Sequence, residues 1–512
     1  MNMAGKAQKK LSDLLSDWVS VPACLDCWVG DIQQDSRKIT RGALFIAAEG
    51  VSSHGQDYID EALARGASAI VLTGERAQVY ERSNVVFVEL EEVRPLIGHI
   101  AHRFFGQVTA GMTVIGVTGT NGKSSVTHYI AELAETMGTS AAVIGTLGIG
   151  KPGALASTTH TTPEAVTTHR HLAQLYEQGI RLVAMEVSSH AMDQYRVAGV
   201  RFKVGVFTNL SRDHLDYHGT MEAYEEAKKQ LLTLPGIKKV INLDDATGRR
   251  WALEMVGENT VTYSSTDERV ARVQARNAMY RDQGIGFDLA YAGDAIPVNV
   301  SLVGEFNLSN VLAATACLLS LGHSLTSIAQ AMTSLTAVPG RVERLQTNDT
   351  AHGRPSVVVD YAHTPDALSV VLQALRVHCR GTLWCVFGCG GDRDPGKRPL
   401  MGEIAESLAD QVVITDDNPR TEDPQLIIAD ILKGLEQPEN AAVIQPRDKA
   451  IEYAIRHAKP GDMVLLAGKG HEDYQEVNGV RLAFSDSKIA RETLEQLIVK
   501  KGNEPRQAGG WV

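Results

Sequence analysis

The segment best suited to chemistry is a short glycine-rich stretch in which Gly119 and Gly122 precede Lys123 and two serines. Glycines permit backbone conformations in which successive N–H groups point into one concavity, and such a concavity at the start of a helix binds phosphate. Lys123 adds a positive charge, and either serine can offer a hydroxyl to Mg²⁺. The segment therefore predicts a nucleotide-binding loop, whose members are Gly119, Thr120, Asn121, Gly122, Lys123, Ser124 and Ser125.

The elements on either side of this loop occur in the order that phosphate binding requires. Residues 113–117 form a short apolar, β-branched run of strand length, and from Val126 the apolar residues recur at helical spacing until Gly138. The strict pattern G-x-x-x-x-G-K-[ST] is not met, because Val117 stands at the first glycine position. The alternative is a plain glycine turn with an exposed lysine, which leaves the order of strand, turn, Lys-Ser and helix unexplained.

Two further positions in the same region could hold a metal ion. Glu186 ends an apolar strand, where phosphate-loop enzymes commonly place a carboxylate that helps to hold Mg²⁺; the alternative is an acid that caps a helix. His214 lies in the polar cluster 213–219, after the next expected strand, 204–208. That cluster could ligate Mg²⁺ or hydrogen-bond a loop, and its position at the sheet edge fits a ligand site.

Lys228 lies in the expected helix 221–232 together with Glu222, Glu225 and Glu226. Lysines beside several glutamates on one helix usually face solvent and make ion pairs with them. The residues by themselves therefore predict a solvated lysine.

The last third of the chain has three loops that are rich in charge and glycine. They are residues 388–394, 417–420 and 468–472, and each follows an expected strand. Ligands bind where the loops at the carboxyl ends of parallel strands converge. We therefore expect a second binding site in this part of the chain.

Length and composition exclude several classes of protein. A chain of 512 residues is too long for one core, and 44% hydrophobic with 22% charged residues is ordinary for a globular protein. The net charge of −11 argues against a general nucleic-acid or membrane-surface binder. No apolar run is long enough to span a bilayer, residues 1–20 lack a signal-peptide core, and Cys24 and Cys27 predict two reduced thiols. We expect a cytoplasmic monomer that binds small molecules.

Alternating strand and helix patterns predict an α/β fold of three domains. A small N-terminal α/β domain occupies residues 1–108, with a polar loop at 52–55. A central domain with a phosphate-loop, ATPase-like parallel sheet occupies residues 109–338. A C-terminal domain with a Rossmann-like, doubly wound sheet occupies residues 339–512, with a disordered tail from Lys501.

Taken together, these stretches resemble the Mur ligases, the ATP-dependent amide-forming enzymes of peptidoglycan precursor synthesis. The resemblance extends from about Asp35 to Asp486. It is carried by residues 119–125, Glu186 to His190, Asp213 to Asp216, Tyr224 to Lys228, Phe306-Asn307 with Asn310, Pro339 to Arg341, and Asp360 to His363. Departures are small: Ser125 stands where Thr is common, His160 where Asn is frequent, and Gln34 where an apolar residue is frequent.

The resemblance implies functions that the residues alone do not give. It implies ATP and two Mg²⁺ ions at the central loop, with Asn307 and Arg341 also at the nucleotide and His363 at the nucleotide or a domain interface. It assigns catalysis and metal binding to Lys123, Ser124, Glu186, His214 and Lys228. It also implies that Lys228 is carbamylated by CO₂, which replaces the cation by a carboxylate-like group.

The resemblance further implies the substrates. Within the family, an Asp-Asn-Pro-Arg motif marks ligases that add meso-2,6-diaminopimelate to UDP-N-acetylmuramoyl-L-alanyl-D-glutamate, and residues 417–420 have this sequence. A guanidinium can hold the second carboxylate that lysine lacks. The implied contacts to the UDP substrate are Ser36, Thr161, Thr162, Ser188, Gln194 and Arg196. The implied contacts to diaminopimelate are Arg393, Asp417, Asn418, Pro419, Arg420, Gly468 and Glu472.

Two alternatives remain open at this point. A relative could add lysine or another amino acid to the same or another carboxylate, as folylpolyglutamate synthases do, and the 417–420 motif argues against this. A protein of another class could keep the fold as a non-catalytic nucleotide-binding scaffold. The joint presence of Lys123, Glu186, His214 and Lys228 argues against a scaffold.

Overall fold

The computed structural model describes residues 8–49, 54–158, 160–266, 270–281, 284–345 and 354–502 of the chain. The predicted loop at 52–55 lies partly, and the predicted tail almost wholly, outside these residues. The described residues belong to two units, the first made of 1–264, 268–273 and 312–328 and the second of 265–267, 274–311 and 329–512. The predicted boundaries near 108 and 338 remain predictions.

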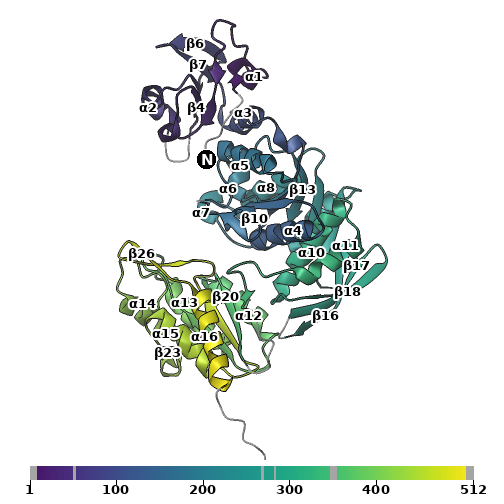
Figure 1. Ribbon diagram of the computed structural model, residues 1–512, viewed down its shortest axis with the longest axis vertical. Coiled ribbons are helices and arrows are strands. Elements are labelled where there is room, and N and C mark those ends of the chain that lie inside the picture. The colour runs from purple at the N-terminus through teal and green to yellow at the C-terminus, as the bar shows by residue number, and fades with distance from the viewer. Residues whose placement is uncertain are drawn as a thin grey trace, which may run out of the picture. The chain divides into compact units, whose positions relative to one another are not determined.

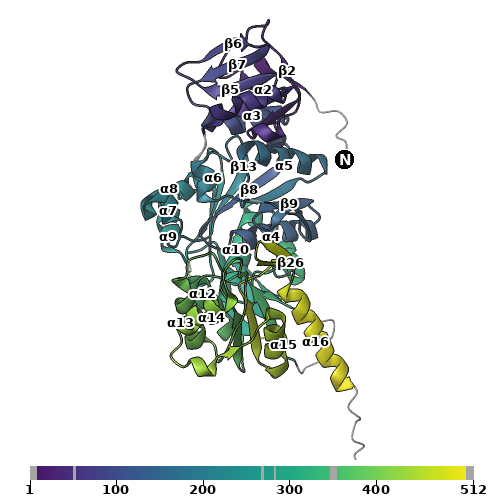
Figure 2. The same cartoon turned by 90° about the vertical axis from the view of Figure 1, so that its left-hand side faces the viewer.

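The N-terminal part of the first unit is a sheet of strand order β3-β4-β5-β7-β6, in which only β6 is antiparallel to its neighbour. Every residue of β4 is buried, as its continuous apolar run predicts. In Figures 1 and 2, α3 lies beside α5 of the following part. The elements are β1 (Lys9–Lys10), α1 (Leu11–Leu15), β2 (Trp28–Val29), β3 (Asp31–Gln33), β4 (Ala43–Ala47), α2 (Ile59–Ala64), β5 (Ala69–Thr73), β6 (Gln78–Arg82), β7 (Val85–Leu90) and α3 (Ile97–Phe104).

The rest of the first unit is a mainly parallel sheet of order β11-β10-β9-β12-β8-β13-β14-β15. Because β12 and β13 flank β8 on opposite sides, the loops after these three strands meet at one switch point of the sheet. Its strands are β8 (Thr113–Thr118), β9 (Ala141–Gly145), β10 (Gly148–Lys151), β11 (Ala154–Ala156), β12 (Leu182–Glu186), β13 (Phe202–Phe207), β14 (Lys238–Asn242) and β15 (Thr260–Ser264). Its helices are α4 (Lys123–Thr136), α5 (Ala165–Glu177), α6 (Ser189–Asp193), α7 (Leu215–His218), α8 (Met221–Leu232) and α9 (Ala246–Glu254).

The strands β16 (Val273–Arg281), β17 (Gly284–Tyr291) and β18 (Asp294–Val300) follow in the chain, and β17 pairs with β18 as an antiparallel hairpin. Next come α10 (Glu305–Ser320) and α11 (Leu325–Ala331). Because α10 begins at Glu305, Asn307 and Asn310 lie within its first two turns.

The C-terminal sheet has the order β19-β20-β24-β21-β22-β23 and is parallel except for β19. Alternate residues of its strands feed two separate buried clusters, so both faces are covered, as in a doubly wound fold. The α/β fold predicted from the sequence is therefore confirmed. Its strands are β19 (Glu343–Arg344), β20 (Ser356–Asp360), β21 (Leu383–Phe387), β22 (Gln411–Ile414), β23 (Ala442–Val443) and β24 (Met463–Ala467).

The helices of this part are α12 (Pro365–Arg376), α13 (Lys397–Leu408), α14 (Pro424–Leu432), α15 (Arg447–His457) and α16 (Asp486–Gly502). A hairpin of β25 (Tyr474–Val477) and β26 (Val480–Ala483) stands apart from the main sheet. Figures 1 and 2 show α15 and α16 side by side. Within the described ranges, we find no helix with the length and apolar character needed to cross a membrane.

Candidate active site

The predicted phosphate loop connects β8 to α4 and is closed by contacts to the end of β13. Gly119 and Gly122 have φ angles of +146° and +84°. A Cβ on Gly119 would stand 1.9 Å from Thr208 Oγ1, so only glycine fits this close approach. Thr208 Oγ1 donates to Asn121 O at 2.6 Å, and Thr120 N donates to Asn209 O at 2.8 Å. The loop is therefore held in shape by side-chain and backbone atoms of Thr208 and Asn209, which bond to its backbone groups.

Lys123 is the first residue of α4, and its side chain folds back over the loop. Its Nζ donates to Gly119 O at 3.0 Å and to Thr120 O at 2.9 Å. This places a positive charge over the backbone N–H groups that open the helix, where the helix dipole also favours an anion.

Glu186 and Ser124, two of the predicted metal ligands, are in direct contact. Ser124 Oγ donates to Glu186 Oε1 at 2.8 Å, and Thr146 N donates to the same oxygen at 2.9 Å. Glu186 is 1% exposed. The helix-capping alternative is wrong, because Ser188 caps α6 by accepting a hydrogen bond from Ala191 N.

A hydroxyl and a carboxylate are the hard oxygen ligands that Mg²⁺ prefers, so this pair fits the ion. Among the described residues, no group of three or more His, Cys, Asp or Glu side chains could hold a metal. Mg²⁺ commonly takes one or two protein oxygens and completes its shell with substrate phosphates and water. The Ser124–Glu186 pair has the composition of such an incomplete protein shell.

Lys228 is not solvated, contrary to the prediction from its helix alone. It is 1% exposed, and its Nζ donates to Gly119 O at 2.9 Å and lies 4.4 Å from the centre of the Tyr224 ring. Burial, together with the nearby charge of Lys123, lowers the pKa of Lys228 to about 6. Its amine is therefore largely uncharged at neutral pH, and it touches the phosphate loop directly.

His214 stands at the start of α7, with a φ angle of +53°. Its Nε2 lies 3.4 Å from Asp213 Oδ2. Its ring packs edge-on against His190 at 4.9 Å between centroids and lies 6.1 Å from Tyr224, the residue that Lys228 contacts. The four predicted catalytic residues of the first unit are thus brought to one sheet edge, with His214 linked to Lys228 through Tyr224.

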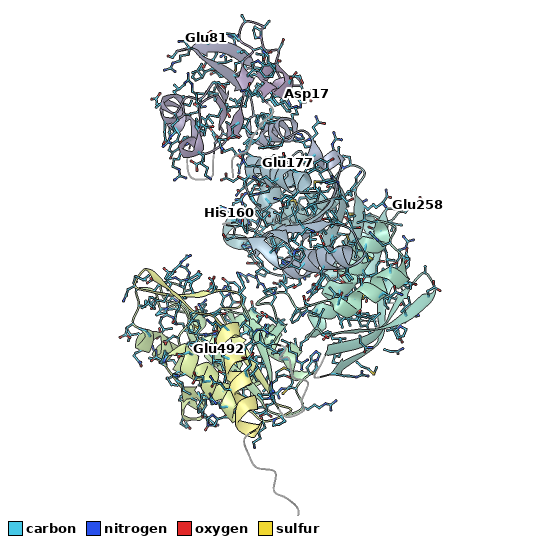
Figure 3. The ribbon with its side chains drawn as sticks, viewed as in Figure 1. Asp17, Glu81, His160, Glu177, Glu258 and Glu492 are labelled. Atoms are coloured by element: carbon cyan, nitrogen blue, oxygen red, sulfur yellow. The ribbon has the colours of Figure 1, made fainter. Side chains whose placement is uncertain are left out.

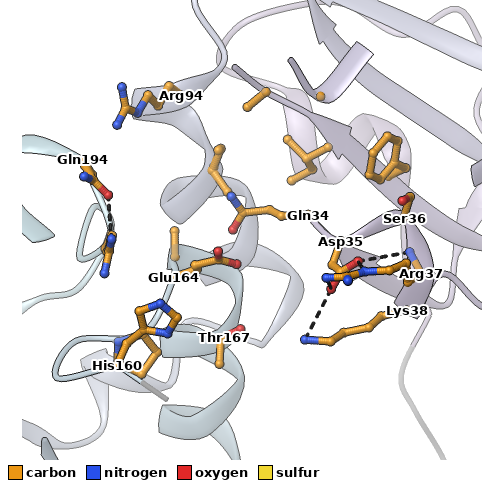
Figure 4. Close-up of a pocket in the computed structure, with 18 of the residues that line it drawn as sticks. Gln34, Asp35, Ser36, Arg37, Lys38, Arg94, His160, Glu164, Thr167 and Gln194 are labelled. Atoms are coloured by element: carbon orange, nitrogen blue, oxygen red, sulfur yellow. Dashed lines mark hydrogen bonds and ion pairs between the residues drawn. The ribbon is translucent and has the colours of Figure 1, made fainter. Parts of the chain in front are cut away.

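A cavity of about 880 Å³ opens between the N-terminal sheet and the loops of the central sheet (Figure 4). Ser36, Gln194 and Arg196, predicted from the resemblance, line it. Arg37, Lys38 and Arg94 also line it and were not predicted. The first two adjoin Ser36 and could have been suspected from their charge, whereas nothing in the sequence sets Arg94 apart. In Figures 3 and 4, His160 lies in the loop at the same cavity.

A chain of hydrogen bonds connects this cavity to Glu186. Arg196 donates to Gln194 Oε1 at 2.6 Å and to Thr162 O at 3.1 Å. Thr162 Oγ1 donates to the backbone oxygen of Glu186 at 2.8 Å and accepts from Ser188 N at 3.1 Å. Thr161, through its hydroxyl, contacts Thr146 Oγ1 at 3.0 Å. The predicted UDP-substrate residues other than Ser36, whose hydroxyl donates to Glu61 Oε2 at 2.5 Å, therefore form a connected path that leads to the expected metal ligands.

The predicted amino-acid residues of the second unit gather around a buried lysine that the sequence did not reveal. Lys469 is 0% exposed and donates to Asn418 Oδ1 at 3.1 Å and to Glu472 Oε2 at 3.0 Å. Asn418 Nδ2 donates to the same Glu472 oxygen at 2.9 Å. A Cβ on Gly468, which has a φ angle of +115°, would stand 2.6 Å from Asp417 Oδ2. That oxygen is buried and makes no hydrogen bond to any residue that the structure describes.

Arg420 lies at the edge of this cluster. Its Nη1 donates to Gly391 O at 2.7 Å, and its Nε lies 3.8 Å from Glu476 Oε2. A Cβ on Gly391 would stand 2.0 Å from Pro419 O, so glycine permits the two loops to touch. Arg393 is exposed, and its Nη1 donates to Asp392 O at 3.0 Å. The structure thus brings together the loops 388–394, 417–420 and 468–472, as predicted.

A fully buried ion pair holds the starting points of two of these loops. Arg447 of α15 and Asp486 of α16 are both 0% exposed and are joined by two hydrogen bonds, the shorter of 2.6 Å. Arg447 also donates to Asp416 O at 3.1 Å and to Ala467 O at 2.9 Å. These carbonyls immediately precede the loops 417–420 and 468–472, so one guanidinium fixes the spacing of both.

Asn307 and Arg341, predicted at the nucleotide, belong to the second unit. Asn307 Nδ2 donates to Val303 O at 2.8 Å from a buried position. Arg341 lies 5.0 Å over the Tyr361 ring, and its buried Nε makes no hydrogen bond within the described part of the chain. His363 Nδ1 lies 2.8 Å from Tyr361 O. Their role at the nucleotide stays a prediction.

Three family models together match most of the chain. The Mur ligase family catalytic domain matches residues 30–105, the Mur ligase middle domain matches residues 117–318, and the Mur ligase glutamate ligase domain matches residues 340–470.

Individual relatives match over nearly their full length. The UDP-N-acetylmuramoyl-L-alanyl-D-glutamate--2,6-diaminopimelate ligase of Pseudomonas aeruginosa is 47% identical over 470 residues, 92% of this chain and 96% of that protein. The protein of the same name from Vibrio vulnificus is 44% identical over 495 residues, 95% of this chain and 98% of that protein.

A solved structure of a ligase of this name is 35% identical, with a TM-score of 0.74 over 96% of this chain and 99% of that chain. The MurF ligase of Thermotoga maritima, solved in complex with ADP, has a TM-score of 0.59 at 18% identity and covers 94% of this chain and 100% of that one, so it shares the fold. The chain belongs to the Mur ligase family.

Proposed function

We propose that this protein is an ATP-dependent ligase that adds meso-2,6-diaminopimelate to UDP-N-acetylmuramoyl-L-alanyl-D-glutamate in peptidoglycan precursor synthesis. The observation that carries the proposal is identity of 44–47% to full-length relatives of that name, together with an Asp-Asn-Pro-Arg loop placed in the cluster around Lys469. Because it would use free ATP and a nucleotide-linked substrate, the protein would act in the cytoplasm. We propose that it acts there as a monomer.

The reaction proceeds by activation of a carboxylate. An oxygen of the D-glutamyl γ-carboxylate attacks the γ-phosphorus of ATP, the bond to the β-phosphate oxygen breaks, and ADP leaves. The uncharged amine of diaminopimelate then attacks the acyl carbon of the acyl phosphate. Phosphate leaves as the amide forms, and the amine nitrogen loses its extra proton. Such chemistry depends chiefly on position and on stabilisation of developing charge.

The phosphate loop would bind the β- and γ-phosphates. Lys123 is held over the loop by two carbonyls, and its charge would offset that of the phosphates as the bond between them breaks. Ser124 and Glu186, 2.8 Å apart, would hold a first Mg²⁺. When bound, Mg²⁺ supplies Lewis-acid neutralisation of phosphate charge. His214 and carbamylated Lys228 would hold a second ion.

Carbamylation of Lys228 is supported by its surroundings. Only an uncharged amine reacts with CO₂, and burial against Tyr224 beside Lys123 keeps the pKa of Lys228 near 6. The nitrogen attacks the carbon of CO₂ and loses a proton, which converts a neutral amine into an anion. A carbamate at this position would face Gly119 and could ligate Mg²⁺ through oxygen.

The cavity lined by Ser36 and Arg196 would take the UDP-muramoyl part of the substrate. Arg94 adds positive charge to its lining, which suits a diphosphate, whereas Arg37 and Lys38 are paired with Asp35 of the same lining and would have to exchange that carboxylate for phosphate. Thr161, Thr162 and Ser188, on the path towards Glu186, would orient the peptide so that its γ-carboxylate reaches the phosphate loop.

The loops around Lys469 would take diaminopimelate. Arg420 and Arg393 would hold carboxylate, and Glu472 would accept from the distal ammonium through Oε1, because its Oε2 already accepts from Lys469 and Asn418. Asp417, Pro419 and Gly468 would shape the site. In this structure the Asn418 amide is engaged within the protein on both its oxygen and its nitrogen, which favours an orienting role.

The test is phosphate release from ATP in the presence of UDP-N-acetylmuramoyl-L-alanyl-D-glutamate, with meso-diaminopimelate compared with L-lysine. We expect release only with diaminopimelate, accompanied by a tripeptide product of the matching mass. Release with lysine alone would keep the ligase and overturn the specificity. No release with either amino acid would favour the nucleotide-binding scaffold.

A further inference from the structure

The hairpin of β25 and β26 lies beside the loops that gather around Lys469, and no motif of the sequence drew attention to it. Its strands pair in register from Tyr474 with Ala483 to Val477 with Val480. The hairpin, labelled at β26 in Figures 1 and 2, follows the loop that carries Glu472 and precedes α16. Its β26 strand is exposed, so packing into the core does not account for it.

The strand β25 is hydrogen-bonded to the Asp-Asn-Pro-Arg loop, residues 417–420. Gln475 Nε2 donates to the backbone oxygen of Asp417 at 2.6 Å. Glu476 N donates to Asn418 Oδ1 at 2.9 Å, the oxygen that also accepts from Lys469. The loop is thus fixed by one side-chain contact and one backbone contact from adjacent hairpin residues.

The hairpin also fixes the backbone of Arg420. Arg420 N donates to Glu476 O at 3.0 Å, and Asn478 N donates to Arg420 O at 2.7 Å. Arg420 has a φ angle of +51°, a left-handed conformation that a residue with a Cβ adopts only when its surroundings impose it. These two hydrogen bonds hold the backbone of Arg420 on both sides of that angle, and the φ angle sets the direction in which the side chain leaves the loop.

The guanidinium is then held by contacts of unequal strength. Its Nη1 is tied to Gly391 O at 2.7 Å, whereas its Nε is only loosely paired with Glu476 Oε2 at 3.8 Å. The loose pair can open without breaking a hydrogen bond, so the Nε edge can turn to a substrate carboxylate while the backbone stays in place.

We propose that the hairpin β25–β26 is the positioning element for amino-acid recognition, with Gln475 as its principal positioning side chain. Gln475 holds the loop 417–420 at Asp417, and the hairpin backbone holds Arg420 in the conformation that aims its guanidinium. The inference rests on the proposed function and deepens it, because it assigns specificity to residues that do not themselves touch the substrate.

The experiment compares Gln475→Ala with a matched control, Val480→Ala, at an exposed position of β26 in the same hairpin. The readouts are KM for meso-diaminopimelate, KM for ATP, kcat and the thermal unfolding midpoint. For Gln475→Ala we expect KM for diaminopimelate to rise about fivefold to tenfold, as the loss of one such hydrogen bond predicts, with KM for ATP and the unfolding midpoint unchanged. For Val480→Ala we expect wild-type values throughout.

A second variant, Gln475→Glu, keeps the side-chain length but sets a carboxylate against the Asp417 carbonyl. We expect an equal or larger rise in KM for diaminopimelate. Unchanged KM in both Gln475 variants, or an equal rise in KM for ATP, would overturn the positioning role. Failure of the wild-type protein to make the tripeptide would overturn the proposed function instead, so the two failures are distinguishable.

Discussion

The phosphate loop of the first unit and the amino-acid loops of the second are held by different kinds of contact. Around the phosphate loop, the contacts fix backbone groups: the side chains of Thr208 and Asn209 hydrogen-bond to the backbone of Asn121, and the 1.9 Å approach to Thr208 Oγ1 leaves room only for glycine at position 119. Around Lys469, side chains satisfy one another, so Asn418 and Glu472 are already engaged before any amino acid arrives. The comparison indicates that reaction chemistry depends here on a rigid backbone, whereas specificity depends on a side-chain network that a few residues can retune.

The largest effect should follow from Lys228→Ala, which removes the buried amine that touches Gly119. If the carbamate helps to position the transferring phosphate, the ligation rate should fall about a thousandfold. The matched control is Lys229→Ala, because Lys229 is the next residue on α8 and pairs with Glu254 at the surface. Phosphate release measures both. An active Lys228→Ala variant would refute the carbamate and the claim that the region around the phosphate loop carries the reaction chemistry.

Gly119→Ala should be the next most damaging change, because its Cβ would collide with Thr208 Oγ1 and force the loop to move. A displacement of about 1 Å can cost about a hundredfold in rate, which we expect in kcat/KM for ATP. Gly138→Ala is the control, since Gly138 has a φ angle of +87° but nothing within 4 Å of an added Cβ. Similar losses in both variants would mean that backbone strain, not the close approach, matters.

Arg420→Ala tests the second region. Loss of a charge-assisted contact to the substrate should raise KM for diaminopimelate about thirtyfold and leave KM for ATP unchanged. Arg420→Lys, which keeps the charge but not the planar fork, should fall between wild type and alanine. Steady-state kinetics with each substrate varied in turn will measure this. Equal effects on both KM values would mean that the two regions do not have separate tasks.

The smallest expected effect is on the pH dependence of the unfolding free energy. Since the pKa of Lys228 is about 6 in the folded protein and 10.5 as its ordinary value, the unfolded chain binds one proton more between these pH values. The unfolding free energy of wild type relative to Lys228→Met should therefore rise with pH, by about 1.4 kcal/mol per pH unit within that window. Denaturant titrations in CO₂-free buffer will measure this slope. A flat difference would show that Lys228 is not buried as an amine.

The local order of apolar, glycine and charged residues along the chain made much of this fold predictable. The strand–loop–helix order at Gly119 to Lys123, and the acid at the end of β12, follow from local sequence and were found where expected. Lys228 was misread because its neighbours Glu222 and Glu226 predict a solvated face. Its burial comes from a contact with Gly119, which is distant in the chain.

The missed residues share this cause. Lys469 lies within a glycine-rich loop but matters through Asn418, and Gln475 matters through Asp417, so their roles exist only once the chain is folded. Arg94 reaches the substrate cavity from a short 3₁₀ helix, Arg94–Leu96, with no motif around it. Local propensity identifies elements and loops, but a network of side chains from distant loops leaves no pattern along the sequence.

The most direct test of the account is one ligation reaction with a substrate whose D-glutamyl γ-carboxylate is labelled with oxygen-18, a heavy oxygen. The reaction contains meso-diaminopimelate and L-lysine at equal concentrations, so that the two amino acids compete. Mass spectrometry reads both the peptide and the released phosphate. The account predicts a diaminopimelate-containing tripeptide and one heavy oxygen in each phosphate, transferred through the acyl phosphate. Lysine in the product, or phosphate without heavy oxygen, would contradict it.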